Sequence, residues 1–285
     1  MKRALSIKDD VVQIATVERL TTVFEGIASL KIGRIRDKVI ISKEFFNDLW
    51  HTYSELRIDP AEQMKRPHRD KKDHEIIVAI TSEAGLSGNL IHDIRQSTER
   101  LLVDDGVVRD VLVIGSHGFS VFEESGVAVT YAYALPASDE HFDVEEIVDV
   151  LREYDHITVL YQTYDSLRVQ RVVATELIAT IQQLGSDLND QHDEEIVSTK
   201  TYVFEPDISD IADHLESLMM NVALTQMIME SKLAQYASRF NAMNRAKKKA
   251  GELRMGATRQ YHRAKRNESD ERLKETMKTL IRRMA

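Results

Sequence analysis

Apolar residues at both ends of this 285-residue chain recur at alternating intervals of three and four. Such spacing is typical of a helix that packs along one stripe against another helix. Because a chain that begins and ends in such helices can pair them with each other, we expect an antiparallel coiled coil that carries a globular domain. The C-terminal series comprises Ile211, Leu215, Leu218, Val222, Met229, Leu233, Tyr236, Phe240, Met243, Ala250, Leu253, Ala257, Tyr261, Ala264, Leu273, Met277, Leu280 and Met284.

The N-terminal helix is predicted from about Ile7 to Leu56, with the C-terminal one running from Ile208 to the end of the chain. Gly26 and Gly33 weaken the first helix, each by up to about 1 kcal/mol relative to alanine. Two interpretations stay open for them: glycines that the helix tolerates, or positions where another backbone approaches closely or the helix bends.

Between the helices, short apolar runs alternate with amphipathic segments, which favours an α/β domain with a mostly parallel, Rossmann-like sheet. Strands are predicted at 76–80, 111–114, 127–133, 157–161 and 201–204, and helices at 90–102, 144–154 and 169–184. The predicted organisation is an N-terminal coiled-coil helix (1–58), a basic linker (59–74), an α/β head (75–206) and a C-terminal coiled-coil helix (207–285).

Composition and charge narrow the class of protein. The chain has no cysteine, which excludes disulfides and thiolate metal sites, and no apolar run approaches the ~20 residues that span a bilayer. We therefore expect a cytoplasmic protein without membrane insertion. The net charge is −9, yet the segment from Lys232 onward holds sixteen Lys and Arg against five Asp and Glu, a net charge of +11. This asymmetry predicts an acidic partner, or else a solvated basic face.

Residues that could support chemistry are few. Gly85 to Gly88 follow a predicted strand and precede a helix, but they lack the P-loop and dinucleotide patterns, so a structural turn is the better interpretation. His117 could act as a base, although no nucleophile in a known context accompanies it. The acidic segment 187–195 matches no known metal-ligand spacing. We expect no catalytic residue, cofactor or metal.

Several ordered motifs resemble those of the gamma subunit of F-type ATP synthases. The segment 80–88 (ITSEAGLSG) is similar to the family's TSDRGLCG, 113–118 (VIGSHG) to its VIGKKG, and 161–164 (YQTY) to its YNxF. The segment 202–207 (YVFEPD) matches most closely. The spacing of Ser231, Ala237, Arg239 and Ala242 also resembles the family's C-terminal helix.

The resemblance implies the central rotor of a rotary ATP synthase. In that family the two helices lie inside a hexamer of α and β subunits, while the head binds the epsilon subunit and the membrane c-ring. It implies a non-catalytic subunit, peripheral to the cytoplasmic side of a bacterial membrane, without nucleic-acid binding. Residues expected to contact partners are Arg34, Arg36, Lys247, Lys248, Lys249, Arg254, Arg259, Arg266, Asp270, Met277, Leu280, Ile281 and Met284.

Some residues depart from the family pattern. Arg266 and Asp270 occupy positions where the family has Gln and Thr in polar contact with a catalytic subunit, and Arg282 and Arg283 end a helix whose tip should meet an apolar bearing. Three alternatives stay open: a rotor-like subunit of another hexameric ATPase, a coiled-coil structural or nucleic-acid-binding protein, and a nucleotide-binding enzyme that uses Gly85 to Gly88.

Overall fold

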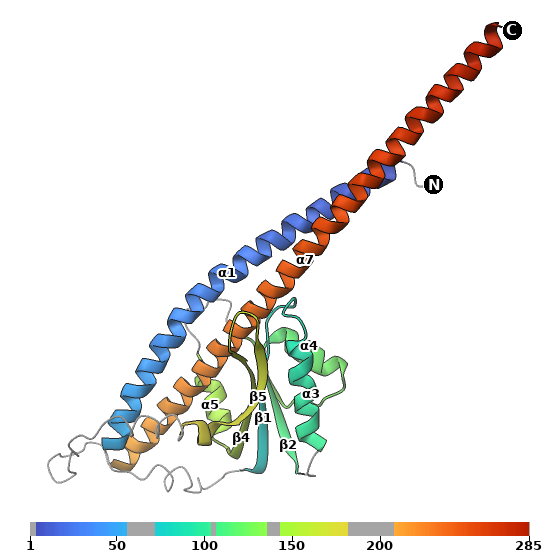
Figure 1. The fold of residues 1–285 in the computed structure, drawn as a ribbon. Coiled ribbons are helices and arrows are strands. Elements are labelled where there is room, and N and C mark those ends of the chain that lie inside the picture. The colour runs from blue at the N-terminus through green and yellow to red at the C-terminus, as the bar shows by residue number, and fades with distance from the viewer. Residues whose placement is uncertain (1–3, 56–71, 104–106, 136–142, 182–207, 285) are drawn as a thin grey trace. The chain divides into compact units, whose positions relative to one another are not determined.

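The computed structural model describes residues 4–55, 72–103, 107–135, 143–181 and 208–284. The chain forms two compact units, the first made of residues 1–29 and 240–285, the second of residues 30–239. Helices α1 (Ala4–Glu55) and α7 (Ile208–Met284) each contribute to both units. The two long helices predicted from apolar spacing are therefore confirmed (Figure 1).

The second unit is built on a five-stranded sheet in the order β3-β2-β1-β4-β5. Its strands are β1 (Lys72–Ile80), β2 (Arg109–Ile114), β3 (Tyr131–Tyr133), β4 (Tyr154–Tyr164) and β5 (Gln170–Glu176). Strands β1 to β4 pair in parallel, and only β5 runs antiparallel, beside β4. The mostly parallel sheet is thus confirmed.

Helices cover both faces of this sheet, which explains why β1 is apolar at five consecutive positions. Val78 and its neighbours on one face pack with α5 (Glu145–Leu151), and with Phe46 and Trp50 of α1 and Met219 to Ile228 of α7. Ile77 and Ala79 face the other way, toward Ile94 of α3 (Leu90–Val103) and Phe122 of α4 (Ser116–Glu124). Both long helices therefore bury apolar side chains within this unit.

Three predictions for the middle of the chain need correction. The helix predicted over 169–184 is wrong in its first half, because Gln170–Glu176 is strand β5 and helix begins only at Leu177. Its β-branched residues pair with β4 across a tight turn in which Ser166 and Val169 exchange backbone hydrogen bonds of 3.2 Å. The strand predicted over 127–133 is confined to Tyr131–Tyr133, and α4 was not predicted.

Several sequence features lie outside the described residues. They are the basic residues 65–71, the acidic segment 187–195, the strand predicted at 201–204 and the motif 202–207. The predicted domain boundaries stay a prediction.

Candidate functional site

The first unit is an antiparallel helix pair whose register is set by three polar contacts. The backbone N–H of Ala4 donates to Glu268 Oε1 at 2.9 Å. Fourteen residues further along α1, Glu18 Oε2 lies 2.8 Å from Arg254 Nε, and seven further Glu25 Oε2 lies 2.9 Å from Lys247 Nζ. The partner residues on α7 are fourteen and then seven residues nearer its N-terminus, so the pairing keeps a heptad register.

Side chains at the centre of this helix pair are small or polar. On α1 the buried positions include Thr21 and Ala28, and on α7 they include Ala250. A Cβ added at Gly251 would lie 3.6 Å from Glu18 Oε1, so the two helices approach closely here. We call the face of α7 that carries Ala250, Ala257 and Ala264 the α1-facing seam.

Exposed apolar side chains of α1 lie on a face adjacent to the one that packs against α7. Leu20 is 52% exposed, Phe24 40% and Ile27 46%. Their spacing of four and three residues, together with exposed Val17 and Val23, forms one stripe along the helix. We call these five residues the outer apolar face. Since α1 carries apolar stripes on two faces, one for α7 and one exposed, it has the pattern of a helix with a second packing partner.

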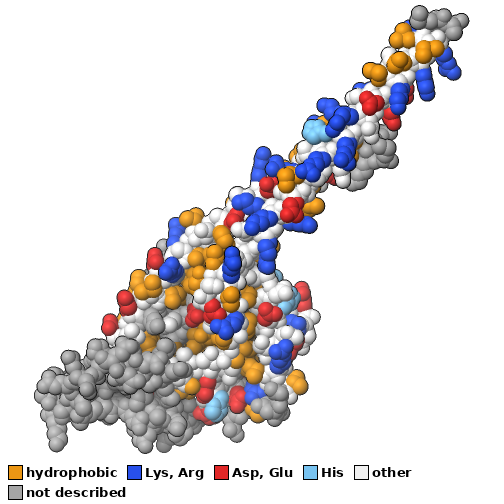
Figure 2. Space-filling model, viewed as in Figure 1, with side chains coloured by type: hydrophobic (Ala, Val, Ile, Leu, Met, Phe, Trp, Pro, Cys, Tyr) orange, Lys and Arg blue, Asp and Glu red, His pale blue; other side chains and the backbone are white. Residues whose placement is uncertain are grey.

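Positive charge accompanies this face. Residues 1–29 and 240–285 contain eighteen Lys and Arg against nine Asp and Glu, a net charge of +9. Figure 2 shows Lys and Arg side chains distributed along the C-terminal part of α7. The helix pair therefore combines an exposed apolar stripe with a basic surface.

The predicted contact residues fall into two groups. Lys247 and Arg254 form ion pairs within the helix pair, so they help to hold α1 and α7 together. The side chains of Lys248, Lys249 and Arg259 are exposed, as are those of Arg34 and Arg36 in the second unit.

The predicted partner-contact residues near the end of α7 have exposed side chains wherever the structure describes them. Arg266 lines an open hollow of about 400 Å³ with His262, Lys265 and Ser269, and Asp270 is exposed one turn further on. Exposure is 55% for Met277, 56% for Leu280 and 65% for Ile281. The side chain of Met284 lies outside the described set.

The predicted apolar series of α7 is wrong at Leu253 and at Leu273. Leu253 and Leu273 are exposed by 52% and 64%, so neither is part of a packed stripe. From Ala264 to Leu273 the chain advances nine residues, or about two and a half turns at 3.6 residues per turn. Leu273 therefore lies on the side of α7 opposite the α1-facing seam.

In the second unit, α7 occupies the place where open α/β sheets usually bind ligands. That place is a crevice at the carboxyl ends of the strands. It lies at the point in the sheet where the strand order reverses, which here is between β1 and β4. Gln235 Nε2 donates to the Thr81 carbonyl at 3.0 Å and to Gln162 Oε1 at 3.2 Å, while Ser231 Oγ also donates to Gln162. These four residues are buried, so the crevice is filled by the chain's own helix.

The glycine-containing loop 83–88 is likewise bound to α7. Arg239 Nη2 donates to the carbonyls of Ala84 and Gly85, both at 3.0 Å, and Ser238 Oγ donates to the Ser87 carbonyl at 2.8 Å. Burial lowers the pKa of Arg239, whose guanidinium carbon lies 5.4 Å from the Tyr236 ring centroid. A phosphate site would instead direct backbone N–H groups at its ligand. The turn interpretation of Gly85 to Gly88 is therefore supported.

His117 packs against this loop, because a Cβ added at Gly85 would lie 3.3 Å from its Nε2. At Gly26 and Gly33 an added Cβ would meet nothing within 4 Å. Close backbone approach is thus ruled out as the reason for these two glycines among the described residues.

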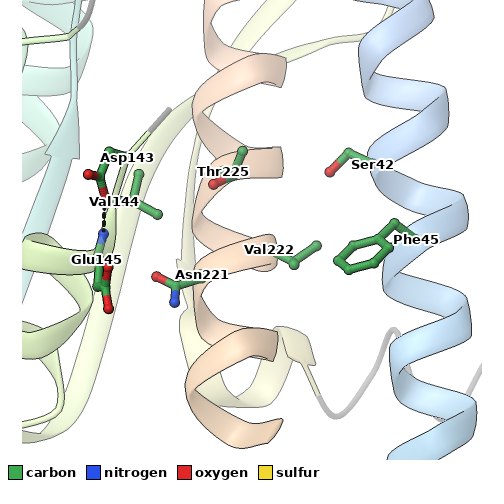
Figure 3. Close-up of a pocket in the computed structure, with 8 residues that line it drawn as sticks. All are labelled: Ser42, Phe45, Asp143, Val144, Glu145, Asn221, Val222 and Thr225. Carbon is green, nitrogen blue, oxygen red and sulfur yellow. Dashed lines mark hydrogen bonds between the residues drawn. The ribbon is translucent and has the colours of Figure 1, made fainter. Parts of the chain in front are cut away.

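An open groove of about 320 Å³ lies between α1, the start of α5 and α7. Figure 3 shows the side chains of Phe45 and Val222 directed toward each other and Asn221 directed toward Glu145. Asp143 Oδ1 accepts the Glu145 backbone N–H at 3.2 Å, beside the start of α5. The lining contains no nucleophile paired with a base.

Within the described ranges, no three His, Asp or Glu side chains gather as a metal site would require. Among the described helices, none has both the length and the apolar composition needed to cross a membrane.

A family model described as ATP synthase matches residues 4–275, nearly the entire chain. The chain belongs to the ATP synthase gamma family. Its relatives include the ATP synthase gamma chain of Chlorobium phaeobacteroides, 26% identical over 91% of each chain, and that of Chlorobaculum tepidum, 23% identical over 88% of this chain and 89% of the relative.

Solved structures agree with the gamma fold. A chain of the Euglena gracilis mitochondrial ATP synthase matches 97% of this chain and 94% of its own length, with a TM-score of 0.66 and 14% identity. A chain from the central stalk and c-ring of the Tetrahymena thermophila mitochondrial enzyme matches 80% and 99%, with a TM-score of 0.57 and 18% identity. As a gamma family member, the chain is a central-stalk subunit of an F-type ATP synthase.

The outer apolar face was the main feature of this gamma subunit that sequence reasoning missed. Leu20, Phe24 and Ile27 recur at helical spacing, as do Ile7, Val11 and Ile14 on the buried side. The presence of two apolar stripes on one helix was the signal that could have revealed it.

Proposed function

We propose that this gamma subunit is the rotor shaft that couples ion-driven rotation of a membrane c-ring to ATP synthesis or hydrolysis in a hexamer of α and β subunits. Residues 1–29 and 240–285 would lie inside the hexamer, and the α/β unit would bind the epsilon subunit and the c-ring. The protein would be peripheral, on the cytoplasmic side of a bacterial membrane.

The outer apolar face is the observation that carries this proposal furthest. Its five aliphatic and aromatic residues are exposed on a helix whose adjacent face packs against α7. Exposed apolar stripes of this kind mark protein interfaces. The net charge of +9 on the same unit favours a partner surface rich in Asp and Glu.

The exposed side chains indicate which residues would contact the partner subunits. Lys248, Lys249 and Arg259 would meet acidic loops of the catalytic subunits, together with Arg34 and Arg36. Arg266 and Asp270 would meet polar groups of the same subunits beside the hollow near His262. Lys247 and Arg254 would contribute through their ion pairs, because these hold the two helices in register.

The mechanism needs no catalytic residue from this chain. An asymmetric shaft makes different contacts with each catalytic subunit as it turns. Contacts that are stronger in one conformation of a subunit shift that subunit between open and closed states. ATP chemistry would then belong to the partner subunits, consistent with a strand-end crevice that α7 fills.

Reconstitution with purified α and β subunits tests the proposal. The double variant Leu20→Asp/Phe24→Asp should weaken binding to the hexamer at least tenfold and uncouple ATPase activity from rotation. Val103→Asp is the control, since Val103 is 82% exposed on α3 and belongs to the second unit. Failure of the unmodified chain to bind any α/β hexamer would refute the proposal.

A further inference from the structure

One face of α7 directs polar side chains into the interior of the α/β unit. Ser231, Gln235, Ser238 and Arg239 follow one another at steps of four, three and one, so they share a stripe of the helix. We call these four residues the polar stripe. Ser231 and Gln235 are buried, and Ser238 and Arg239 are partly buried. Because buried positions are usually apolar, the stripe calls for an explanation.

The polar stripe faces the sheet and not α1. Met229 and Leu233 of α7 pack with Ile35 of α1. Ser231 and Gln235 each follow one of these two residues by two positions, or about 200° around the helix. In this unit α7 therefore lies between α1 on one side and the carboxyl ends of the strands on the other.

The hydrogen bonds of the polar stripe end mainly on backbone carbonyls. Gln235 donates to the carbonyl at the end of β1, and Ser238 and Arg239 donate to carbonyls of loop 83–88. Hydrogen bonds are directional, whereas apolar contacts are not. The stripe therefore opposes rotation of α7 about its own axis more strongly than apolar packing at the same positions would.

Loop 83–88 is itself held by other parts of the α/β unit. The carboxylate of Glu83 accepts the backbone N–H of Ser116, at the start of α4, at 3.2 Å and that of Leu135, after β3. Leu86 has a φ of 70°, a left-handed conformation that is costly for a non-glycine residue and persists only where the surrounding structure holds it. A force that acts on Arg239 is therefore passed through the loop to α4 and to the end of β3.

The polar stripe ends where α7 leaves the α/β unit. Arg239 is the last residue of α7 that belongs to this unit, and Phe240 is the first that belongs to the helix pair. Any torque that passes from the α/β unit along α7 must therefore enter the helix at or before Arg239.

We propose that the polar stripe is the joint that transmits torque from the α/β unit to α7, and that Arg239 is its main positioning residue. The inference rests on the proposed function and assigns residues to one step of it. Arg239 Nη2 alone reaches two carbonyls at 3.0 Å and Ser87 Oγ at 3.3 Å. The same bonds satisfy backbone carbonyls and so contribute to stability, a role that the experiment has to separate from torque transmission.

The test measures the steady-state ion gradient that the complete synthase, assembled with this chain, builds in vesicles at a given rate of ATP hydrolysis. Ser238→Ala/Arg239→Met keeps an apolar stem at position 239 and removes the donors to loop 83–88. It should build roughly half the gradient of the unmodified chain or less, because α7 yields to the opposing load once the directional bonds are gone. Tyr154→Phe is the control for stability, since it removes a hydrogen bond of 2.7 Å to Asp110 at the amino ends of the strands. It should build the unmodified gradient.

A covalent link offers a rescue of the same joint. An added Cβ at Gly88 would lie 3.1 Å from Ser238 Oγ, so cysteines at these two positions are within reach of a disulfide. The chain has no cysteine of its own. Oxidised Gly88→Cys/Ser238→Cys/Arg239→Met should build the unmodified gradient, and the reduced form the low one. Both forms carry the same substitutions, so strain at position 88 does not account for a difference between them.

Each result decides a separate point. An unmodified gradient in Ser238→Ala/Arg239→Met, or equal gradients in the oxidised and reduced cysteine variant, would refute the joint while the rotor function stands. A gradient lowered equally by Tyr154→Phe would assign the loss to stability and refute the joint as well. If Ser238→Ala/Arg239→Met does not assemble, the cysteine variant, assembled in its oxidised form and then reduced, decides the question. A synthase with the unmodified chain that builds no gradient would refute the proposed function itself.

Discussion

Glu18 of α1 and Arg254 of α7 form an ion pair of 2.8 Å that repeats one heptad further on as Glu25 and Lys247 at 2.9 Å. Acidic groups stand on α1 and basic groups on α7 in both pairs. Because the flanking seam is made of small residues, the helices come close enough for these side chains to reach across. The ion pairs therefore specify the register that small side chains alone would leave weakly determined.

A double-mutant cycle on this ion pair should give a small coupling energy. Arg254 is 47% exposed and Glu18 26%, so we expect about 0.5 kcal/mol between Glu18→Ala and Arg254→Ala, decreasing in high salt. Denaturant unfolding measures it. The mismatched cycle of Glu18→Ala with Lys247→Ala should give coupling near zero, and equal values for both cycles would contradict a specific pair.

Replacing Gln235 should destabilise the α/β unit. Gln235→Leu removes the donor to the Thr81 carbonyl and to Gln162, both of which stay buried. A buried polar group that loses its partner costs about 1–3 kcal/mol. Chemical denaturation should show this loss, whereas Gln96→Leu on the exposed side of α3 should change stability little.

Gly118→Ala should be strongly unfavourable. An added Cβ would lie 1.8 Å from Thr81 Oγ1 and 2.3 Å from Thr81 Cβ, so the end of β1 and the start of α4 would have to separate. Overpacking of this kind costs about 1–3 kcal/mol. The substitution should be less unfavourable in a Thr81→Gly background, and an equal cost in both backgrounds would disprove the clash as the cause.

The glycines of α1 predict the opposite result. Gly26 and Gly33 are in helix, and nothing lies within 4 Å of an added Cβ. Alanine should therefore stabilise the chain by about 0.5–1 kcal/mol at each site. Thermal unfolding of Gly26→Ala and Gly33→Ala measures this gain, and destabilisation would reveal a requirement for bending.

Tyr161 predicts a loss of stability in alkali. Burial, reinforced by the negative charge of Glu230, raises the pKa of Tyr161 from 10.0 to about 12. The unfolded chain therefore releases this proton near pH 10 while the folded chain keeps it. Stability is full below pH 10 and falls by up to about 2–3 kcal/mol as the pH rises to 12. Tyr161→Phe should flatten this slope in denaturant titrations at pH 9 to 12, and an unchanged slope would exclude Tyr161 as its source.

Local periodicity predicted much of the fold. The helices around Ile7 to Leu56 and from Ile208 onward, and the strand at Ile76 to Ile80, follow from spacing and from a short apolar run, both of which depend on near neighbours. The segment 169–184 was mistaken for a single helix because its apolar residues fit a helical period. Pairing with β4, a tertiary contact, makes its first half a strand.

For the candidate site, the sequence determined that α1 is a helix with two apolar stripes and that the end of α7 is basic. Only the tertiary structure decided which stripe of α1 packs on α7. The packed stripe carries small residues such as Thr21 and Ala28, which let the two helices approach. At that distance Glu18 reaches Arg254. The same holds for the strand-end crevice. Gln235 and Thr81 are 154 residues apart, and no local pattern indicates that one fills the ligand position beside the other.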